Sequence, residues 1–162
     1  MKSATLPALK KELQYRSQEQ LIDFCLTMAR FKLESKELLT YLVFESENEE
    51  AYIDSVKAYI DDTFDEINAT NYYYIKKSVR KILRQVKRYI RYSKKKETEA
   101  LLLIHFCVKL KQLKPSYSRN TVLVNMFNKQ KELAQKAIAK LHEDLQYDYQ
   151  LIIEEELAMS IH

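Results

Sequence analysis

The stretch that decides the fold is residues 71–96, NYYYIKKSVRKILRQVKRYIRYSKKK. It contains eleven of the chain's 27 Lys and Arg residues and none of its 23 Asp and Glu residues. Apolar side chains recur in it every three or four residues, which is the period of an amphipathic α-helix. We therefore predict a basic helix over residues 72–92. The net charge of +4 comes from this segment, because the remainder of the chain is acidic overall.

On a helix of 3.6 residues per turn, the apolar and charged side chains of this segment separate onto opposite sides. The apolar side carries Tyr72, Ile75, Val79, Ile82, Leu83, Val86, Tyr89 and Ile90. The opposite side, which we call the basic face, carries Tyr73, Lys76, Lys77, Arg80, Lys81, Arg84, Lys87, Arg88 and Arg91. We expect the apolar side to pack into a core. The basic face is the candidate site for an anion or a nucleic acid.

The segment before this helix has the opposite charge. Residues 45–66 carry nine acidic residues and one basic residue, Lys57, again with a helical apolar period. Ser46 and Glu49 have the spacing of a capping box, so we expect this helix to start at Ser46. If the two helices pair through their apolar sides, their charged sides point apart. The basic face then meets water, a partner or the acidic residues near the C-terminus, which are Glu143, Asp144, Asp148, Glu154, Glu155 and Glu156.

The chain contains no glycine and only two prolines. The tight turns of strand hairpins normally use glycine, so we do not expect a sheet protein. Helices must also end without a glycine cap, and we expect Asn, Ser or Lys there. We predict an all-α single domain over residues 1–162, with seven or eight antiparallel helices in a helical bundle or a short HEAT-like α-α superhelix. The superhelix alternative rests on a faint repeat between residues 21–30 and 82–91.

Three further segments are predicted to be helical. Residues 97–113 are apolar nearly all round, so this helix should lie in the middle of the fold. The pattern over residues 120–158 predicts either one protruding helix or two helices joined near His142 and Glu143. Residues 18–31 follow a capping box at Ser17 to Gln20, and should turn inward Leu21, Ile22, Cys25, Met28 and Ala29.

The sequence offers no constellation typical of catalysis. P-loops, Rossmann motifs and nucleophile elbows all depend on glycine. The three histidines, His105, His142 and His162, lack metal-ligand spacing, and we interpret His105 as a core histidine with satisfied hydrogen bonds. Cys25 and Cys107 lie in apolar runs and are interpreted as buried small hydrophobic residues. We predict no catalytic, cofactor-binding or metal-binding residue, and no cofactor.

One acidic pattern could still bind a metal ion. Asp61, Asp62 and Asp65 have the DDxxD spacing, which resembles that by which all-α isoprenoid synthases hold magnesium. Those enzymes are much longer and carry a second acidic motif that this chain lacks. We therefore interpret the three aspartates as a solvated acidic turn. An all-α metal-dependent enzyme with carboxylates at residues 50–66 is the least favoured function.

Together these patterns predict a non-catalytic helical interaction or scaffold protein rather than an enzyme. We expect its partner to be a protein, a second copy of the chain included. An acidic protein or an anionic membrane surface would also fit the basic face. The alternative is a nucleic-acid-binding protein that uses residues 72–92, because Lys and Arg contact phosphates and tyrosines stack on bases. No apolar run approaches the ~20 residues of a transmembrane helix, and no signal peptide is evident, so we expect a cytoplasmic protein.

Overall fold

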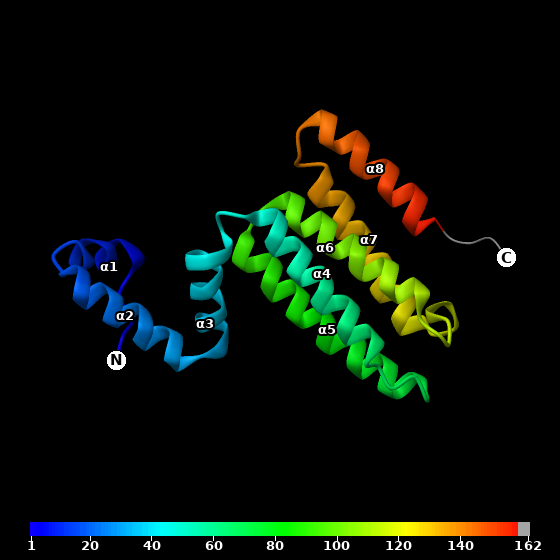
Figure 1. Ribbon diagram of the computed structural model, residues 1–162, viewed down its shortest axis with the longest axis horizontal. Helices are drawn as coiled ribbons and strands as arrows, with labels where there is room; N and C mark the ends of the chain where they lie inside the picture. Colours follow the sequence, from blue (N-terminus) through cyan, green and yellow to red (C-terminus); the bar gives the residue numbers. More distant parts are fainter. Residues whose placement is uncertain (159–162) are drawn as a thin grey trace. The chain divides into compact units, whose positions relative to one another are not determined.

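The computed structural model describes residues 1–158, and all its regular structure is helical (Figure 1). Within these residues there are eight α-helices, a π-helical turn at Tyr41–Glu45 and a short 3-10 helix at Tyr117–Arg119. The predicted all-α class and the helix number are confirmed. Contacts group the chain into two compact units, Met1–Phe44 and Glu45–His162. None of the helices within residues 1–158 combines the length and the apolarity that crossing a bilayer requires.

The first unit contains α1 (Leu6–Leu13), α2 (Gln18–Phe31) and α3 (Leu33–Thr40). The capping box at the start of α2 is confirmed. The Ser17 hydroxyl accepts from the Gln20 backbone N–H at 3.1 Å, and the Gln20 side chain accepts from the Ser17 N–H at 3.0 Å. At Lys32 the backbone becomes extended, so the chain turns and α3 packs against α2.

The helices of the first unit do not bury their apolar side chains. None of the residues of α1, α2 or α3 is buried. The predicted inward position is therefore wrong for three of the five α2 residues: Ile22 and Met28 are 53% and 59% exposed, and Cys25 is exposed. Leu21 and Ala29 are half-buried. The physical reason is that apolar residues occupy more than half of the circumference of α2, and a single short helix, α3, cannot cover so wide an arc.

The second unit contains α4 (Glu49–Asp65), α5 (Tyr72–Ser93), α6 (Lys96–Gln112), α7 (Thr121–Ile138) and α8 (Glu143–Leu157). Helix α6 lies at its centre and contacts the other four helices. Figure 1 shows α4 and α5 on one side of α6, and α7 and α8 on the other. Eight of the 17 residues of α6 are buried. The predicted central position of this helix is confirmed.

The ends of α4 and α5 show how a chain without glycine starts and stops helices. Helix α4 is capped by Asn48, whose side-chain oxygen accepts from the Ala51 N–H at 3.1 Å, so the predicted start at Ser46 is wrong. Helix α5 ends at Lys94 in the left-handed conformation, with φ of 62°. The expectation of Asn, Ser or Lys at every C-terminus fails elsewhere. Helices α4 and α6 are followed by Glu66 and Leu113 at negative φ, which any residue can adopt.

The last two helices form a hairpin. Helix α7 ends at Ile138 and α8 begins at Glu143, so residues 120–158 are two helices joined next to His142 and not one continuous helix. The side chain of Gln146 fixes the turn, because its Nε2 donates to the carbonyl oxygens of Leu141 at 2.6 Å and Ala139 at 3.3 Å. Helix α8 therefore folds back and packs against α6 and α7.

Candidate anion-binding face

Helix α5 is held firmly, with its apolar side in the core of the second unit. Ile75, Val79 and Val86 have no exposed surface, and the predicted burial of this side is confirmed. Near the N-terminus of α5, the Tyr72 hydroxyl donates to the Ser116 carbonyl oxygen at 2.8 Å. Near the other end, the Tyr52 hydroxyl of α4 donates to a backbone carbonyl of α5 at 2.9 Å. These contacts fix the rotation of α5 and therefore the direction of its basic face.

All nine residues of the basic face lie on the side of α5 away from this core. Lys76 and Arg88 are half-buried. The ring of Tyr73 is 65% exposed and packs edge-to-face on Tyr74, with 5.3 Å between the ring centroids. The remaining members are exposed, namely Lys77, Arg80, Lys81, Arg84, Lys87 and Arg91. The cations of the face extend from Lys76 to Arg91, about 22 Å along the helix axis.

Most cations of the basic face lack a carboxylate partner. Within residues 45–158, no Asp or Glu oxygen lies within 4.0 Å of the side-chain nitrogens of Lys76, Lys77, Arg80, Lys81, Arg84, Lys87 or Arg91. Arg88 is set apart from these seven cations because it is held by a side chain of its own helix: its guanidinium donates to the side-chain oxygen of Gln85 at 3.2 Å. The like charges of the face are therefore left to water or to an external anion.

The acidic residues that could have neutralised this face point elsewhere. On α4, the Asp61 carboxylate oxygen Oδ1 accepts from the ring nitrogen Nε2 of His105 at 2.7 Å and lies 3.7 Å from the Lys109 ammonium, and Asp65 lies 3.4 Å from the same ammonium. These partners belong to α6, not to α5. The acidic helix α8 packs on α6 and α7, and none of its carboxylates in residues 143–157 pairs with the basic face. The C-terminal acids therefore do not cover it.

Part of the basic face forms a shallow hollow of about 460 Å³. Tyr73 and four cations line it, namely Lys76, Lys77, Arg80 and Arg84. Arginine guanidinium groups can bind phosphate oxygens in a bidentate manner, and an exposed aromatic ring can stack on a base. The hollow therefore combines cations that can bind the phosphates of a nucleic acid with an aromatic ring that can stack on a base.

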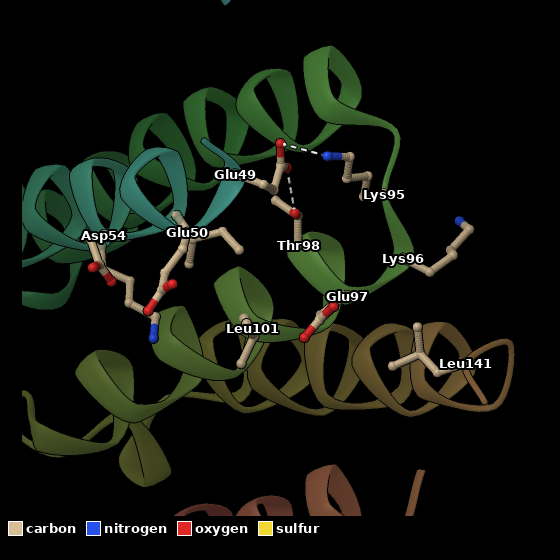
Figure 2. Close-up of a pocket in the computed structure, with 11 residues that line it drawn as sticks. Glu49, Glu50, Asp54, Lys95, Lys96, Glu97, Thr98, Leu101 and Leu141 are labelled. Carbon is tan, nitrogen blue, oxygen red and sulfur yellow. Dashed lines mark hydrogen bonds and ion pairs between the residues drawn. The ribbon is translucent and has the colours of Figure 1, made fainter. Parts of the chain in front are cut away.

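A second hollow, of about 670 Å³, lies between the start of α4 and the junction of α5 and α6 (Figure 2). Glu49 is one of the residues that line it, and its carboxylate accepts from the Thr98 hydroxyl at 2.6 Å and from the Ser93 hydroxyl, and lies 3.3 Å from the Lys95 ammonium. Thr98 is fully buried. Because Glu49 joins α4 to the α5–α6 turn, we assign it a structural role. Its partners lie 44 to 49 residues away in the sequence, so no local sequence pattern could have predicted these contacts.

The DDxxD aspartates and the histidines do not assemble a metal site. Within residues 1–158 no group of three or more His, Cys, Asp and Glu side chains is placed to hold a metal ion. His105 is hydrogen-bonded to Asp61, so the predicted hydrogen-bonded state of its ring is confirmed. Its side chain is partly exposed, so the predicted core position is only partly confirmed. His142 caps α8. His162 lies outside the described residues.

Two side chains with raised pKa values, Cys107 and Tyr149, are buried in the second unit. Burial raises the pKa of the Cys107 thiol to about 12, which keeps it protonated and unreactive, and its predicted burial is confirmed. Burial, with a hydrogen bond to the Glu97 carboxylate, also raises the pKa of the Tyr149 hydroxyl. Neither group lies on the basic face, so neither contributes to it.

Comparison of the chain with family models, with curated proteins and with solved structures finds no match. The geometry of the basic face is therefore the basis for the function proposed next.

Proposed function

We propose that this protein is a non-catalytic interaction module that binds nucleic acid along the basic face of α5. One observation carries the proposal: seven of the eight Lys and Arg side chains of the face have no carboxylate partner within residues 45–158. If the face served only solubility, nearby carboxylates would stabilise the protein by reducing the repulsion between its cations. The chain has many acidic residues on α4 and α8 that could do this. Their placement elsewhere leaves the face open to an external polyanion.

Nucleic acid fits this face better than an acidic protein does. The cations repeat along about 22 Å of one rigid helix, which suits a regular row of phosphates. Binding such a row releases condensed counterions, so affinity comes from the salt-dependent term that dominates non-specific binding. The exposed ring of Tyr73 beside the hollow adds a surface on which an unpaired base can stack. We therefore favour a single-stranded ligand.

The test measures binding of a fluorescently labelled single-stranded RNA, and of a duplex of the same sequence, over a series of salt concentrations. If about five cations contact phosphates, the slope of log K against log salt is about −3.5 for the single strand and about −4.5 for the duplex. The double variant Arg80→Gln with Arg84→Gln should flatten the single-strand slope by about 1.4. Its matched control is Lys114→Gln with Lys140→Gln, which removes the same charge from exposed sites outside α5.

A further variant separates stacking from charge. Tyr73→Ala should weaken binding of the single strand by roughly 5- to 150-fold, because base–aromatic stacking contributes about 1–3 kcal/mol. Binding of the duplex should change little, since its bases are already stacked on one another. Absence of binding at low salt, or equal slopes for the α5 variant and its control, would refute the proposal. Binding of an acidic peptide but of neither RNA would instead assign the face to a protein partner.

The metal-enzyme alternative is not favoured by these contacts. The carboxylates of Asp61 and Asp65 lie against the Lys109 ammonium at 3.7 and 3.4 Å. A divalent cation at that position would have to displace this ammonium. We therefore do not propose a metal-dependent activity for residues 50–66.

A further inference from the structure

Helices α2 and α3 enclose an apolar groove of about 650 Å³ within the first unit. Leu26, Leu33, Val43 and Phe44 line it, and Leu33 and Phe44 are 63% and 76% exposed. Burying a large apolar side chain contributes about 1.5–3 kcal/mol relative to leaving it in water. A groove with several such side chains is therefore a strong site for an apolar partner surface.

The rim of this groove is basic. Arg30, Lys32 and Lys36 line it together with the apolar residues, and all three are exposed. Within residues 1–44, no carboxylate oxygen lies within 4.0 Å of their side-chain nitrogens. The occupant that matches such a groove is an amphipathic helix that presents apolar side chains one turn apart with acidic side chains around them.

Helix α8 has a face of this kind. Tyr147 and Leu151 are four residues apart and therefore on one side of α8, and they are 70% and 38% exposed. The helix carries six acidic residues and no Lys or Arg. Three of these acids lie beside Tyr147 and Leu151, are exposed, and form no ion pair within residues 45–158, namely Asp148, Glu154 and Glu155. The opposite side of α8 is occupied by the core of the second unit, through Tyr149, Ile153 and Leu157.

We infer that the outer face of α8 binds the α2–α3 groove of a second copy of the chain. In a two-fold dimer the contact is made twice, because each copy offers one groove and one α8, and the assembly closes without leaving either surface open. Tyr147 and Leu151 enter the groove, and Asp148, Glu154 and Glu155 face the basic rim. The dimer would bury the apolar side chains of the first unit that this unit leaves exposed.

The test uses two charge-reversal variants of the full chain. The groove variant is Arg30→Glu, Lys32→Glu and Lys36→Glu, and the α8 variant is Asp148→Lys, Glu154→Lys and Glu155→Lys. Sedimentation velocity over a concentration series gives the dimer dissociation constant of each, and circular dichroism checks that each remains helical. The wild-type chain should be a dimer, and each variant alone should dimerise at least tenfold more weakly. The control is Lys2→Glu, Lys10→Glu and Lys11→Glu, which makes the same charge change in the same unit away from the groove.

Mixing the two variants gives the decisive result. In a heterodimer of groove variant and α8 variant, both contacts again join opposite charges, so the equimolar mixture should recover a dimer that contains one copy of each. Native mass spectrometry identifies it, since the two chains differ in mass. A monomeric wild-type chain, variants that dimerise as the wild type does, or a mixture that stays monomeric would each overturn the inference. Should the α8 of the same chain occupy the groove, the wild type would be monomeric, which is one of these outcomes.

A second substitution tests the apolar part of the contact without any change of charge. Tyr147→Ala should weaken the dimer at least tenfold, as expected for a large aromatic residue at the centre of an interface. Tyr74→Ala is the matched control, because Tyr74 is 44% exposed on α5 and lies outside the proposed contact. Equal dissociation constants for these two variants would contradict the assignment of Tyr147 to the groove.

Discussion

Replacing Glu49 by Ala should destabilise the second unit more than any other single change of a charged residue in α4. The Glu49 carboxylate accepts from the hydroxyls of Ser93 and Thr98, and both of those residues are buried. Removing the carboxylate leaves the hydroxyl groups of two buried residues without that acceptor. It also breaks the 3.3 Å contact with the Lys95 ammonium, whose side chain is half exposed.

The magnitude follows from the two kinds of contact. A hydrogen bond to a charged group contributes about 1.5–3 kcal/mol, so two of them give about 3 kcal/mol at the lower end. The pair with Lys95 adds less than about 1 kcal/mol, because solvent screens it. The free energy of unfolding should therefore fall by about 3 kcal/mol, a large part of the ~5–15 kcal/mol typical of a native protein.

Urea unfolding followed by circular dichroism measures this loss. With an m value of about 1.5 kcal/mol per M, the midpoint should fall by about 2 M. Glu50→Ala is the matched control, since Glu50 is adjacent, equally charged and exposed, and should change the free energy of unfolding by less than about 0.5 kcal/mol. The isosteric change Thr98→Val should cost about half as much as Glu49→Ala. Equal midpoints for the Glu49 and Glu50 variants would refute the reasoning.

Three further changes test the core, the thiols and a helix end. Leu102→Ala should lower the free energy of unfolding by about 2–5 kcal/mol, since Leu102 has no exposed surface. Leu145→Ala, at a residue 37% exposed, should cost under about 1 kcal/mol in the same urea assay. Burial raises the pKa of the Cys107 thiol from 9.0 to about 12, so the folded state holds its proton more tightly than the unfolded state. Stability is then lost as the pH rises from about 9 to about 12, and Cys107→Ala should reduce this pH dependence in unfolding curves. A maleimide should label only the exposed Cys25 in the native protein, and both thiols in denaturant, as mass spectrometry would show. Lys94→Gly should raise the urea midpoint through a gain of about 1 kcal/mol, because Lys94 has a φ of 62° that glycine adopts without strain, and Lys94→Ala should not.

Periodicity predicted those features that depend on one helix alone. The central place of α6 was predictable because its own apolar residues lie around nearly its whole circumference. A helix of this kind is stable only inside a fold. The outward direction of the basic face was predictable for the same reason, since Ile75 and Val79 require burial on the other side. Local spacing also identified the Ser17 cap of α2.

Features that depend on a second element could not be predicted in this way. The exposure of Cys25 follows from the narrow arc of α2 that α3 covers, and the pattern of α2 itself contains no information about its neighbours. Ser46 and Asn48 can both cap a helix, and the sequence does not show which side chain reaches the first free N–H. Whether the C-terminal acids cover the basic face depended on the direction in which α8 turns back at residues 139–142.

The central position of α6 has a consequence for the order in which the second unit can fold during synthesis. Helices α4 and α5 precede α6 in the chain, and α6 supplies much of the surface against which they bury their apolar sides. At about 5–20 residues per second, a ribosome needs roughly 3–13 s to extend the chain from the start of α4 to the end of α6. During that interval a nascent chain exposes an acidic and a basic amphipathic helix without a core. Ribosome-bound chains stalled before residue 96 should accordingly be cut readily by protease, and chains stalled well after residue 138 should resist it.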